Sequence, residues 1–438
     1  MLYLDLELLY QPFRQECFVL RGLQQRALPV LSVSLVLACC GGGTATKELL
    51  TSPTGFTVKP SAESTLLTTS QRGALGFQFG PPDGSIGVLA NGASYTFFMP
   101  ATSSSSCSGT PSTRGTYRLG GSLTAITAPY GCSAVIKPGG DPNGYTFDHD
   151  YAAGGPVLTV TSASGASGIL HIYHGELHGG TCSGLGQCFY SSLGMALSKD
   201  GGATFSKLGE ILQPWVPRSL VLNANQNLDV GGGTLLIADG NGQHIASLTA
   251  ADPANTFLYV FFSDFDPSAP APCNQDACLA LARAPLATVV ADAFSGNTAA
   301  FPTLFKKLYK GAFTEPGTSG DANAAANSGH YTPVIAASGS FPSVLYDAST
   351  QRYLIAYTTN NNAIAMQHGA SLLSWSGPIA SGAITASGKS ILYPTLIGEG
   401  TDPTTGNGNP WLIYISGTNW PDWSTTNVVS RRLQITYK

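Results

Sequence analysis

The sequence has little charge and few signals for helices. Charged residues make up 11% of its 438 residues, well below the quarter that is usual for soluble domains. No stretch after residue 44 shows sustained helical periodicity, and no basic stripe accompanies the net charge of −4. A helical protein and a nucleic-acid partner are therefore both disfavoured. No Cys-x-x-Cys pair follows the N-terminal segment, so the cysteine spacing does not favour zinc.

Glycine and proline are abundant, with 52 and 28 residues, as expected for many short strands joined by tight turns. One apolar, aromatic-rich strand pattern of eight residues recurs four times without gaps and ends each time in small or polar residues. Because such a strand cannot bury its own faces, its recurrence predicts a propeller of stacked sheets. The four copies are Ile169–Glu176, Phe257–Asp264, Tyr353–Asn360 and Trp411–Thr418.

The fold class that follows is all-β, a five-bladed β-propeller with four-stranded antiparallel blades. We expect the repeated strands to be the innermost ones, so that their polar ends meet at a central funnel. The segment Val429–Tyr437 is expected to close the ring by pairing with the N-terminal blade, which removes an open sheet edge. The predicted blades span residues 73–137, 155–213, 232–311, 328–378 and 383–438.

The N-terminus is interpreted as a targeting segment. An apolar run of about a dozen residues is too short to span a bilayer, and Val36–Cys39 resembles a bacterial lipobox with Cys39 as the lipidated residue. The predicted domains are a signal peptide at 1–38, a lipidated cysteine and flexible linker at 39–70, and one propeller at 71–438. A plain signal peptide is the alternative. The expected location is the bacterial cell envelope, where a monomer contacts the membrane only through its lipid anchor.

Export implies an oxidising compartment, and six cysteines fall as neighbouring pairs. Short loops favour the disulfides Cys107–Cys132, Cys182–Cys188 and Cys273–Cys278. The segment Ser198–Phe205 matches the Asp-box of sialidase-like propellers. In this hairpin we expect Asp200 to cap its own turn, which is a structural role and not a catalytic one.

The candidate chemistry centres on Glu176. On an extended strand His174, Glu176 and His178 share one face, and partial burial is expected to raise the pKa of Glu176 toward use as a general acid. Asp264 occupies the same column of the repeat, and Asp150 offers a second carboxylate that could act as base or nucleophile. Loop hydrogen bonding, turn capping and a metal site of His174, Glu176 and His178 stay open as alternatives. No cofactor is expected, with Ca²⁺ in the central channel as the alternative.

His174 and four other residues are candidates for substrate binding. Asn360 fills the polar column in a later blade, and Arg283 could contact an anionic group. Aromatic faces stack on the apolar faces of sugar rings, which makes Tyr173 and Trp420 candidate platforms.

The Pro-led strands Phe341–Asp347 and Tyr393–Gly398, each ahead of a repeated strand, resemble the five-bladed propellers of the arabinanase and fructosidase type (glycoside hydrolase family 43-like). The segment Leu279–Leu286 followed by Leu308–Gly311 is similar to uncharacterised bacterial domains whose relatives include endo-acting arabinanases. This resemblance implies hydrolysis of furanosides by a set of Asp and Glu residues in the funnel. It also implies an Asp on the first blade, where Asp83 is the one acid and its Pro-Pro-Asp-Gly setting indicates a turn.

Two functions are consistent with these patterns. The first is a membrane-anchored glycoside hydrolase acting on a polysaccharide or oligosaccharide. The second is a non-catalytic propeller that binds glycans or proteins at the cell surface, since one fold hosts both functions.

Overall fold

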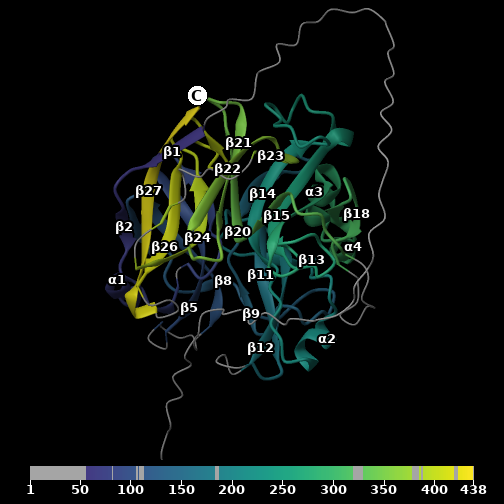
Figure 1. Cartoon of the computed structure of the whole chain (residues 1–438), viewed down its shortest axis with the longest axis horizontal. Coiled ribbons are helices and arrows are strands. Elements are labelled where there is room, and N and C mark those ends of the chain that lie inside the picture. The colour runs from purple at the N-terminus through teal and green to yellow at the C-terminus, as the bar shows by residue number, and fades with distance from the viewer. Residues whose placement is uncertain are drawn as a thin grey trace, which may run out of the picture.

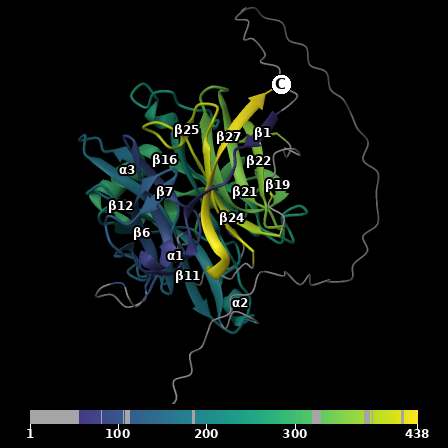
Figure 2. The ribbon, with the colours of Figure 1, turned by 90° about the vertical axis from the view of Figure 1, so that its left-hand side faces the viewer.

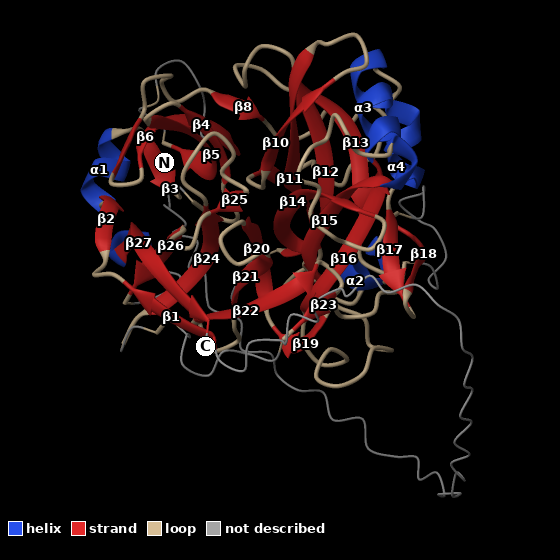
Figure 3. Ribbon diagram, turned by 90° about the horizontal axis from the view of Figure 1, so that it is seen from above, coloured by secondary structure: helices blue, strands red, loops and turns tan. Residues whose placement is uncertain are grey.

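The computed structural model describes residues 56–80, 82–104, 107, 113–182, 187–318, 329–376, 384–385, 388–418 and 423–437. Within these residues the strands form five mainly antiparallel sheets, which follow one another round the molecule as the blades of a propeller (Figure 3). The predicted all-β fold and the predicted number of blades are confirmed, but the sheets contain five or six strands each and not four, because short strands pair beside the main ones.

The first two blades are built around long central hairpins, β5 with β6 and β11 with β12. Helix α1 (Thr69–Ala74) precedes the first blade. The first blade contains β3 (Phe77–Phe79), β4 (Gly87–Asn91), β5 (Ser94–Ser103), β6 (Arg114–Ser122), β7 (Ala125–Thr127) and β8 (Ala134–Ile136). The second contains β9 (Tyr151–Ala153), β10 (Val157–Thr161), β11 (Ser167–Gly179), β12 (Cys188–Ser198) and β13 (Ser206–Leu212).

The third blade carries helices on its flank, beside strands β14 and β15 (Figure 1). Helix α2 (Arg218–Asn223) leads into this blade, and α3 (Leu286–Ser295) and α4 (Phe301–Leu304) interrupt it. Its strands are β14 (Gly231–Asp239), β15 (Thr256–Asp264), β16 (Cys278–Pro285), β17 (Lys306–Tyr309), β18 (Ala312–Pro316) and β19 (Ile335–Ser338). The fourth blade contains β20 (Ser340–Asp347), β21 (Arg352–Thr358), β22 (Ile364–Ser371), β23 (Ser374–Trp375) and the short β25 (Thr405–Gly406).

The fifth blade joins the two ends of the described chain. It contains β24 (Ser390–Ile397), β26 (Trp411–Gly417) and β27 (Thr426–Tyr437), and β27 pairs with both β1 (Phe56–Pro60) and β2 (Ser64–Leu67). Strands β1 and β27 lie side by side in Figures 1 and 2. Residues 56–67, which the sequence assigned to a linker, therefore complete the last blade. They are held there because Val58 and Leu67 are buried in the core.

The repeated strands are not the innermost ones, which corrects the expectation from sequence. They are β11, β15, β21 and β26, the second strands of blades two to five. The first strands β4, β10, β14, β20 and β24 lie nearest the axis and together surround a small cavity of about 40 Å³. Apolar side chains from all five strands line it: Val88, Val157, Leu235, Val344 and Leu396.

The turn hydrogen bond of the Asp-box and the three disulfides form as the sequence predicts. In the Asp-box, Oδ1 of Asp200 accepts from the backbone N–H of Thr204 at 2.9 Å, and Phe205 packs edge-on against Phe98 of the first blade. The disulfides Cys107–Cys132, Cys182–Cys188 and Cys273–Cys278 are all present, which indicates an oxidising compartment outside the cytoplasm. Among the described helices, none has the length and apolar character needed to cross a bilayer.

Closure of the ring by β1 can be tested with two neighbouring substitutions. Val58 is buried against the fifth blade, whereas Lys59 is exposed on the same strand. We expect Val58→Asp to lower the free energy of unfolding by about 2–4 kcal/mol, because an unpaired carboxylate enters the core. Lys59→Asp should change it by less than about 0.5 kcal/mol. Urea denaturation measures both, and equal effects of the two variants would contradict the assigned strand.

Candidate functional site

A cavity of about 620 Å³ lies where the starts of the first strands meet the ends of the second strands. The two meet because neighbouring strands of a blade run antiparallel. Residues from all five blades line this cavity. They include Asp83 and Ser85 of blade one, His174 and Glu176 of blade two, Asp229 and Asp276 of blade three, Phe341 and Asn360 of blade four, and Tyr393 of blade five.

The end of β11 carries a row of ionisable side chains. His174, Glu176 and His178 stand at alternate positions and share one face, as the period of a strand requires. Nε2 of His174 lies 3.1 Å from Oε1 of Glu176, and Nε2 of His178 lies 2.6 Å from Oε2. Both oxygens of a carboxylate that is only 13% exposed are therefore held by imidazole groups.

These contacts reverse the pKa shift that the sequence predicted for Glu176. Burial alone raises the pKa of a carboxyl group, but the hydrogen bonds from His174 and His178 outweigh it and lower the pKa of Glu176 to about 2. Burial also disfavours the charged form of His174. Its hydrogen bond to Glu176 and the charge of Asp229 overcome that effect and raise the pKa of His174 to about 9. Glu176 is thus an ionised acceptor and His174 a cation near neutral pH.

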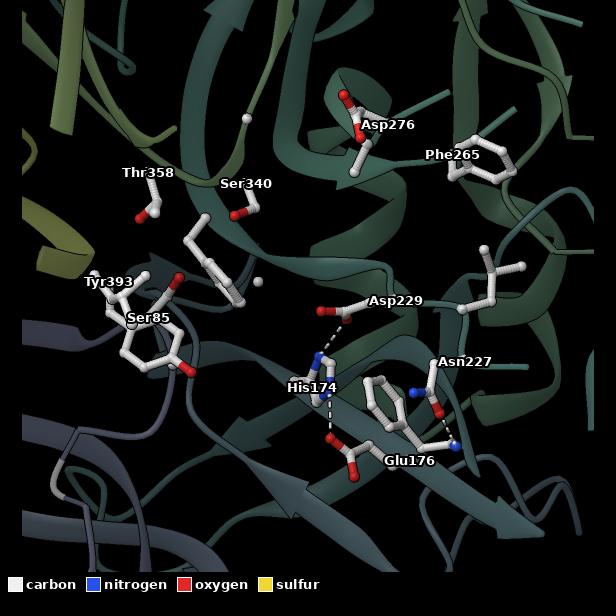
Figure 4. A pocket seen from close by; sticks show the side chains of 18 of the residues that line it. Ser85, His174, Glu176, Asn227, Asp229, Phe265, Asp276, Ser340, Thr358 and Tyr393 are labelled. Carbon is white, nitrogen blue, oxygen red and sulfur yellow. Dashed lines mark hydrogen bonds and ion pairs between the residues drawn. The ribbon is translucent and has the colours of Figure 1, made fainter. Parts of the chain in front are cut away.

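Asp229 extends this row on the other side of His174 (Figure 4). It stands just before β14, where Oγ of Ser191 donates to its Oδ1 at 2.7 Å. Nδ1 of His174 lies 3.8 Å from the same oxygen. The side chain of Asp229 is 30% exposed. Burial raises its pKa, and the nearby charge of His174 opposes that change.

Asp83 is the site residue that sequence reasoning set aside as a turn. The turn exists, but it leads into β4 at the wall of the cavity. The hydroxyl of Tyr151 donates to the backbone carbonyl of Asp83 at 3.1 Å, and that of Tyr393 lies 3.5 Å from its Oδ1. Burial, followed by the negative charge of Glu176, raises the pKa of Asp83 to about 6. One feature of the sequence pointed to Asp83: the resemblance implies an Asp on the first blade, and Asp83 is the one acid in that blade.

Asp264 lies outside the cavity, although it shares a column of the repeat with Glu176. Its carboxylate is fully buried within the third blade, where Nζ of Lys307 donates to Oδ2 at 2.6 Å. The backbone N–H of Phe265 donates to Oδ1 at 2.8 Å. The pair neutralises both charges inside the blade, so the structure does not bring Asp264 together with Glu176.

The strand register explains this difference. His171 of β11 and Val260 of β15 occupy equivalent positions, because their partners Val157 and Leu235 both line the small axial cavity. The gapless alignment of the repeat matches His171 with Tyr259 instead. A slip of one residue turns every side chain to the opposite face of a strand. Residues that the repeat aligns, such as Glu176 and Asp264, therefore lie on opposite faces of their strands.

Three other candidates also lie away from the cavity. Asp150 accepts from the backbone N–H of His178 at 2.7 Å and so fixes the end of β11. Tyr173 is fully buried and donates to Asp148 at 3.2 Å. Arg283 donates to the carbonyl of Gly240 at 2.7 Å and its guanidinium is packed between aromatic rings, 4.0 Å from that of Phe257.

Of the other residues predicted from sequence, one lines the cavity and the rest are not described by the structure. Asn360 lines the cavity. Trp420, Cys39 and the signal segment 1–38 lie outside the described residues. Across the described chain, no group of three or more His, Cys, Asp or Glu side chains is arranged to hold a metal ion. His174, Glu176 and His178 instead bond to one another.

Comparison with known proteins adds a likeness in architecture. No protein-family model and no curated protein matches the sequence. The chain resembles the catalytic domain of a Coprinopsis cinerea GH62 alpha-L-arabinofuranosidase at 10% identity and a TM-score of 0.43, over 87% of this chain and 98% of that one. An alpha-L-arabinofuranosidase from Lactobacillus brevis matches at 11% identity and a TM-score of 0.41, over 82% and 91%. An endo-1,5-alpha-L-arabinanase from Thermotoga petrophila matches at 9% identity and 0.41, over 81% and 72%.

The sheet topology makes the chain a five-bladed propeller. It matches the arabinofuranosidase and arabinanase structures at low identity. At these identities and scores the matches assign neither an activity nor a substrate.

The contacts of His174 with Glu176 and Asp229 predict that its imidazole titrates at an unusually high pH. In the wild-type protein NMR should find its imidazole protonated up to about pH 9. Glu176→Gln removes the main partner charge, so the pKa of His174 should fall by about one unit or more. His149→Gln, at an exposed position, serves as the control and should leave the titration unchanged. An unchanged His174 titration in Glu176→Gln would contradict the pairing.

The same pair predicts how stability depends on pH. The raised pKa of His174 gives stability that is fully present below pH 6.5 and is lost as the pH rises through about 9. The lowered pKa of Glu176 gives stability that is present above pH 4.5 and is lost as the pH falls through about 2. The difference in unfolding free energy between wild type and Glu176→Gln should therefore be largest between pH 4.5 and 6.5. A difference that stays constant from pH 3 to 9 would disprove this linkage.

Proposed function

We propose that the cavity binds a carbohydrate and hydrolyses a glycosidic bond. The observation that carries this proposal is a pair of carboxyl groups in one cavity with opposite pKa shifts, Asp83 at about 6 and Glu176 at about 2. Glycoside hydrolysis needs one carboxyl group that can donate a proton and another that stays ionised. This assignment replaces the sequence hypothesis of Glu176 as the acid.

In this proposal Asp83 donates its proton to the oxygen of the leaving group as the bond from that oxygen to the anomeric carbon breaks. The ionised Glu176 stabilises the positive charge that develops on the sugar. Asp229 accepts a proton from the water that attacks the anomeric carbon, and its partly exposed carboxylate and raised pKa suit a base. His174 holds Glu176 and Asp229 apart, because it bonds to the first and lies beside the second.

A binding protein without catalysis is the second candidate. It is favoured by one observation, that both oxygens of Glu176 are engaged by His174 and His178. A carboxylate held in this way can orient sugar hydroxyl groups without taking part in bond cleavage. Saturable binding on a glycan array together with no release of sugar would favour this function over hydrolysis.

The location proposed for this activity is the bacterial cell envelope. The three disulfides support an oxidising compartment. A signal peptide at 1–38, lipidation at Cys39 and a monomeric state remain part of the proposal. Mass spectrometry of the mature N-terminus from the native host tests the lipid anchor directly.

The proton donor can be tested by substitution. On a glycan that the wild type cleaves, Asp83→Asn should lower kcat/KM by about 10²- to 10⁴-fold, because the leaving oxygen loses its acid. Asp252→Asn provides the control, because Asp252 is exposed and outside the cavity and asparagine keeps the oxygen that caps its turn. This variant should retain most of the activity. Release of reducing sugar from a broad panel of polysaccharides measures both. Full activity in Asp83→Asn, or no release by the wild type, would refute hydrolysis through Asp83.

The pH profile tests the same assignment without a mutation. Asp83 must be protonated to donate, so kcat/KM should fall as the pH rises through about 6. A profile that stays flat between pH 5 and 8 would argue against Asp83 as the acid.

A further inference from the structure

Three consecutive blades begin with the same irregularity at the rim of the cavity. The pairing of first and second strands shifts by one residue between Gly231 and Thr234 in β14, between Ser340 and Ser343 in β20, and between Leu392 and Thr395 in β24. Each shift is a β-bulge, which inserts one extra residue and redirects a side chain. The bulges therefore decide which side chains face the cavity.

The three bulges share the shift in pairing but not the backbone conformation, because positive φ occurs at the bulges of blades four and five and not at Gly232 of blade three. Blade three has Gly232, whereas blades four and five have Phe341 and Tyr393, and all three line the cavity. The backbone φ angles are 53° at Phe341 and 57° at Tyr393. Bulky side chains rarely adopt positive φ, and glycine would occupy these positions without strain. Strain that persists at a cavity wall indicates that the two rings are needed there.

The two rings form one aromatic wall. Their centroids are 4.6 Å apart and their planes meet at 85°, so Phe341 and Tyr393 brace each other edge to face. Figure 4 shows Tyr393 on one side of the cavity and the row of Asp229, His174 and Glu176 on another. The hydroxyl of Tyr393, 3.5 Å from Asp83, joins the aromatic wall to the proposed acid.

The charge of the cavity limits what can bind against this wall. The carboxyl groups that line it are those of Asp83, Glu176, Asp229 and Asp276. Among the described residues of the lining there is no lysine or arginine. The protonated His174 also lines the cavity, but Glu176 and Asp229 already lie on either side of it. A sugar that carries its own carboxylate or sulfate would be repelled by the carboxylates and would have to compete with them for His174.

We infer that the half-buried ring of Phe341, braced edge to face by the buried Tyr393, forms the platform on which the ring of a neutral sugar stacks. An aromatic face covers the apolar face of such a ring, while the carboxylates opposite it accept hydrogen bonds from the hydroxyl groups. This places the leaving oxygen next to Asp83. The inference deepens the proposed function, because it names the class of sugar and the residues that orient it.

The test measures binding and structure separately. Isothermal titration of the full-length protein uses neutral pentose and hexose oligosaccharides, and matched oligosaccharides of uronic acids. We expect the wild type to bind a neutral oligosaccharide and Phe341→Gly to weaken that binding at least about tenfold, because the stacking face is lost. Gln351→Gly is the matched control, since Gln351 also has a φ of 53° but lies in an exposed turn outside the cavity. Its affinity should equal that of the wild type.

A second variant guards against a folding defect. Phe341→Asn keeps a side chain that tolerates positive φ, and its thermal unfolding should stay close to that of the wild type while its affinity falls as in Phe341→Gly. Wild-type affinity in both variants, or tighter binding of the uronic acid series, would overturn the inference about the platform and leave the proposed hydrolysis standing. Binding of neutral sugar without any hydrolysis would leave the platform standing and refute only the catalytic proposal. Failure of the wild type to bind any oligosaccharide would overturn both.

Discussion

The antiparallel pairing of the first and second strands in each blade governs the whole site. It brings the start of one strand and the end of the other to the same end of the ring, for every blade. Polar residues can then stand at strand ends while the strands themselves stay apolar and buried. Asp83 lies just before the first strand β4 and Tyr393 lies in the first strand β24, whereas His174 and Glu176 lie at the end of the second strand β11. Residues more than 300 positions apart in the sequence therefore face one cavity.

Low solvent exposure makes the charges of this cavity depend on one another. Glu176 stays ionised because two imidazoles bond to it, and its charge in turn helps to raise the pKa of Asp83. His174 stays protonated because Glu176 and Asp229 lie on either side of it. The two carboxyl groups are thus driven toward opposite protonation states by their surroundings, which is the arrangement that acid–base chemistry requires. The rings of Phe341 and Tyr393 supply an apolar surface beside these charges. In the proposed site, selection of a sugar needs both this surface and the carboxyl groups.

Much of the architecture could be predicted from the sequence, and the reasons for the errors are physical. The repeat identified the second strands, but both inner strands of a blade are buried and apolar, so hydrophobicity does not show which is nearer the axis. The face shared by His174, Glu176 and His178 follows from strand alternation alone. Asp264 was misplaced by a one-residue slip of register that leaves no mark in the sequence. The bulges at Phe341 and Tyr393 were equally hidden, because positive φ is normally signalled by glycine.

The site is best tested by a crystal structure of the Asp83→Asn variant with a bound neutral oligosaccharide. We expect one sugar ring against Phe341 and Tyr393, with its glycosidic oxygen within about 3.2 Å of the side chain of residue 83. Glu176 and Asp229 should lie beside the anomeric carbon of the same ring. An oligosaccharide bound elsewhere on the propeller, with the cavity left to solvent, would contradict it.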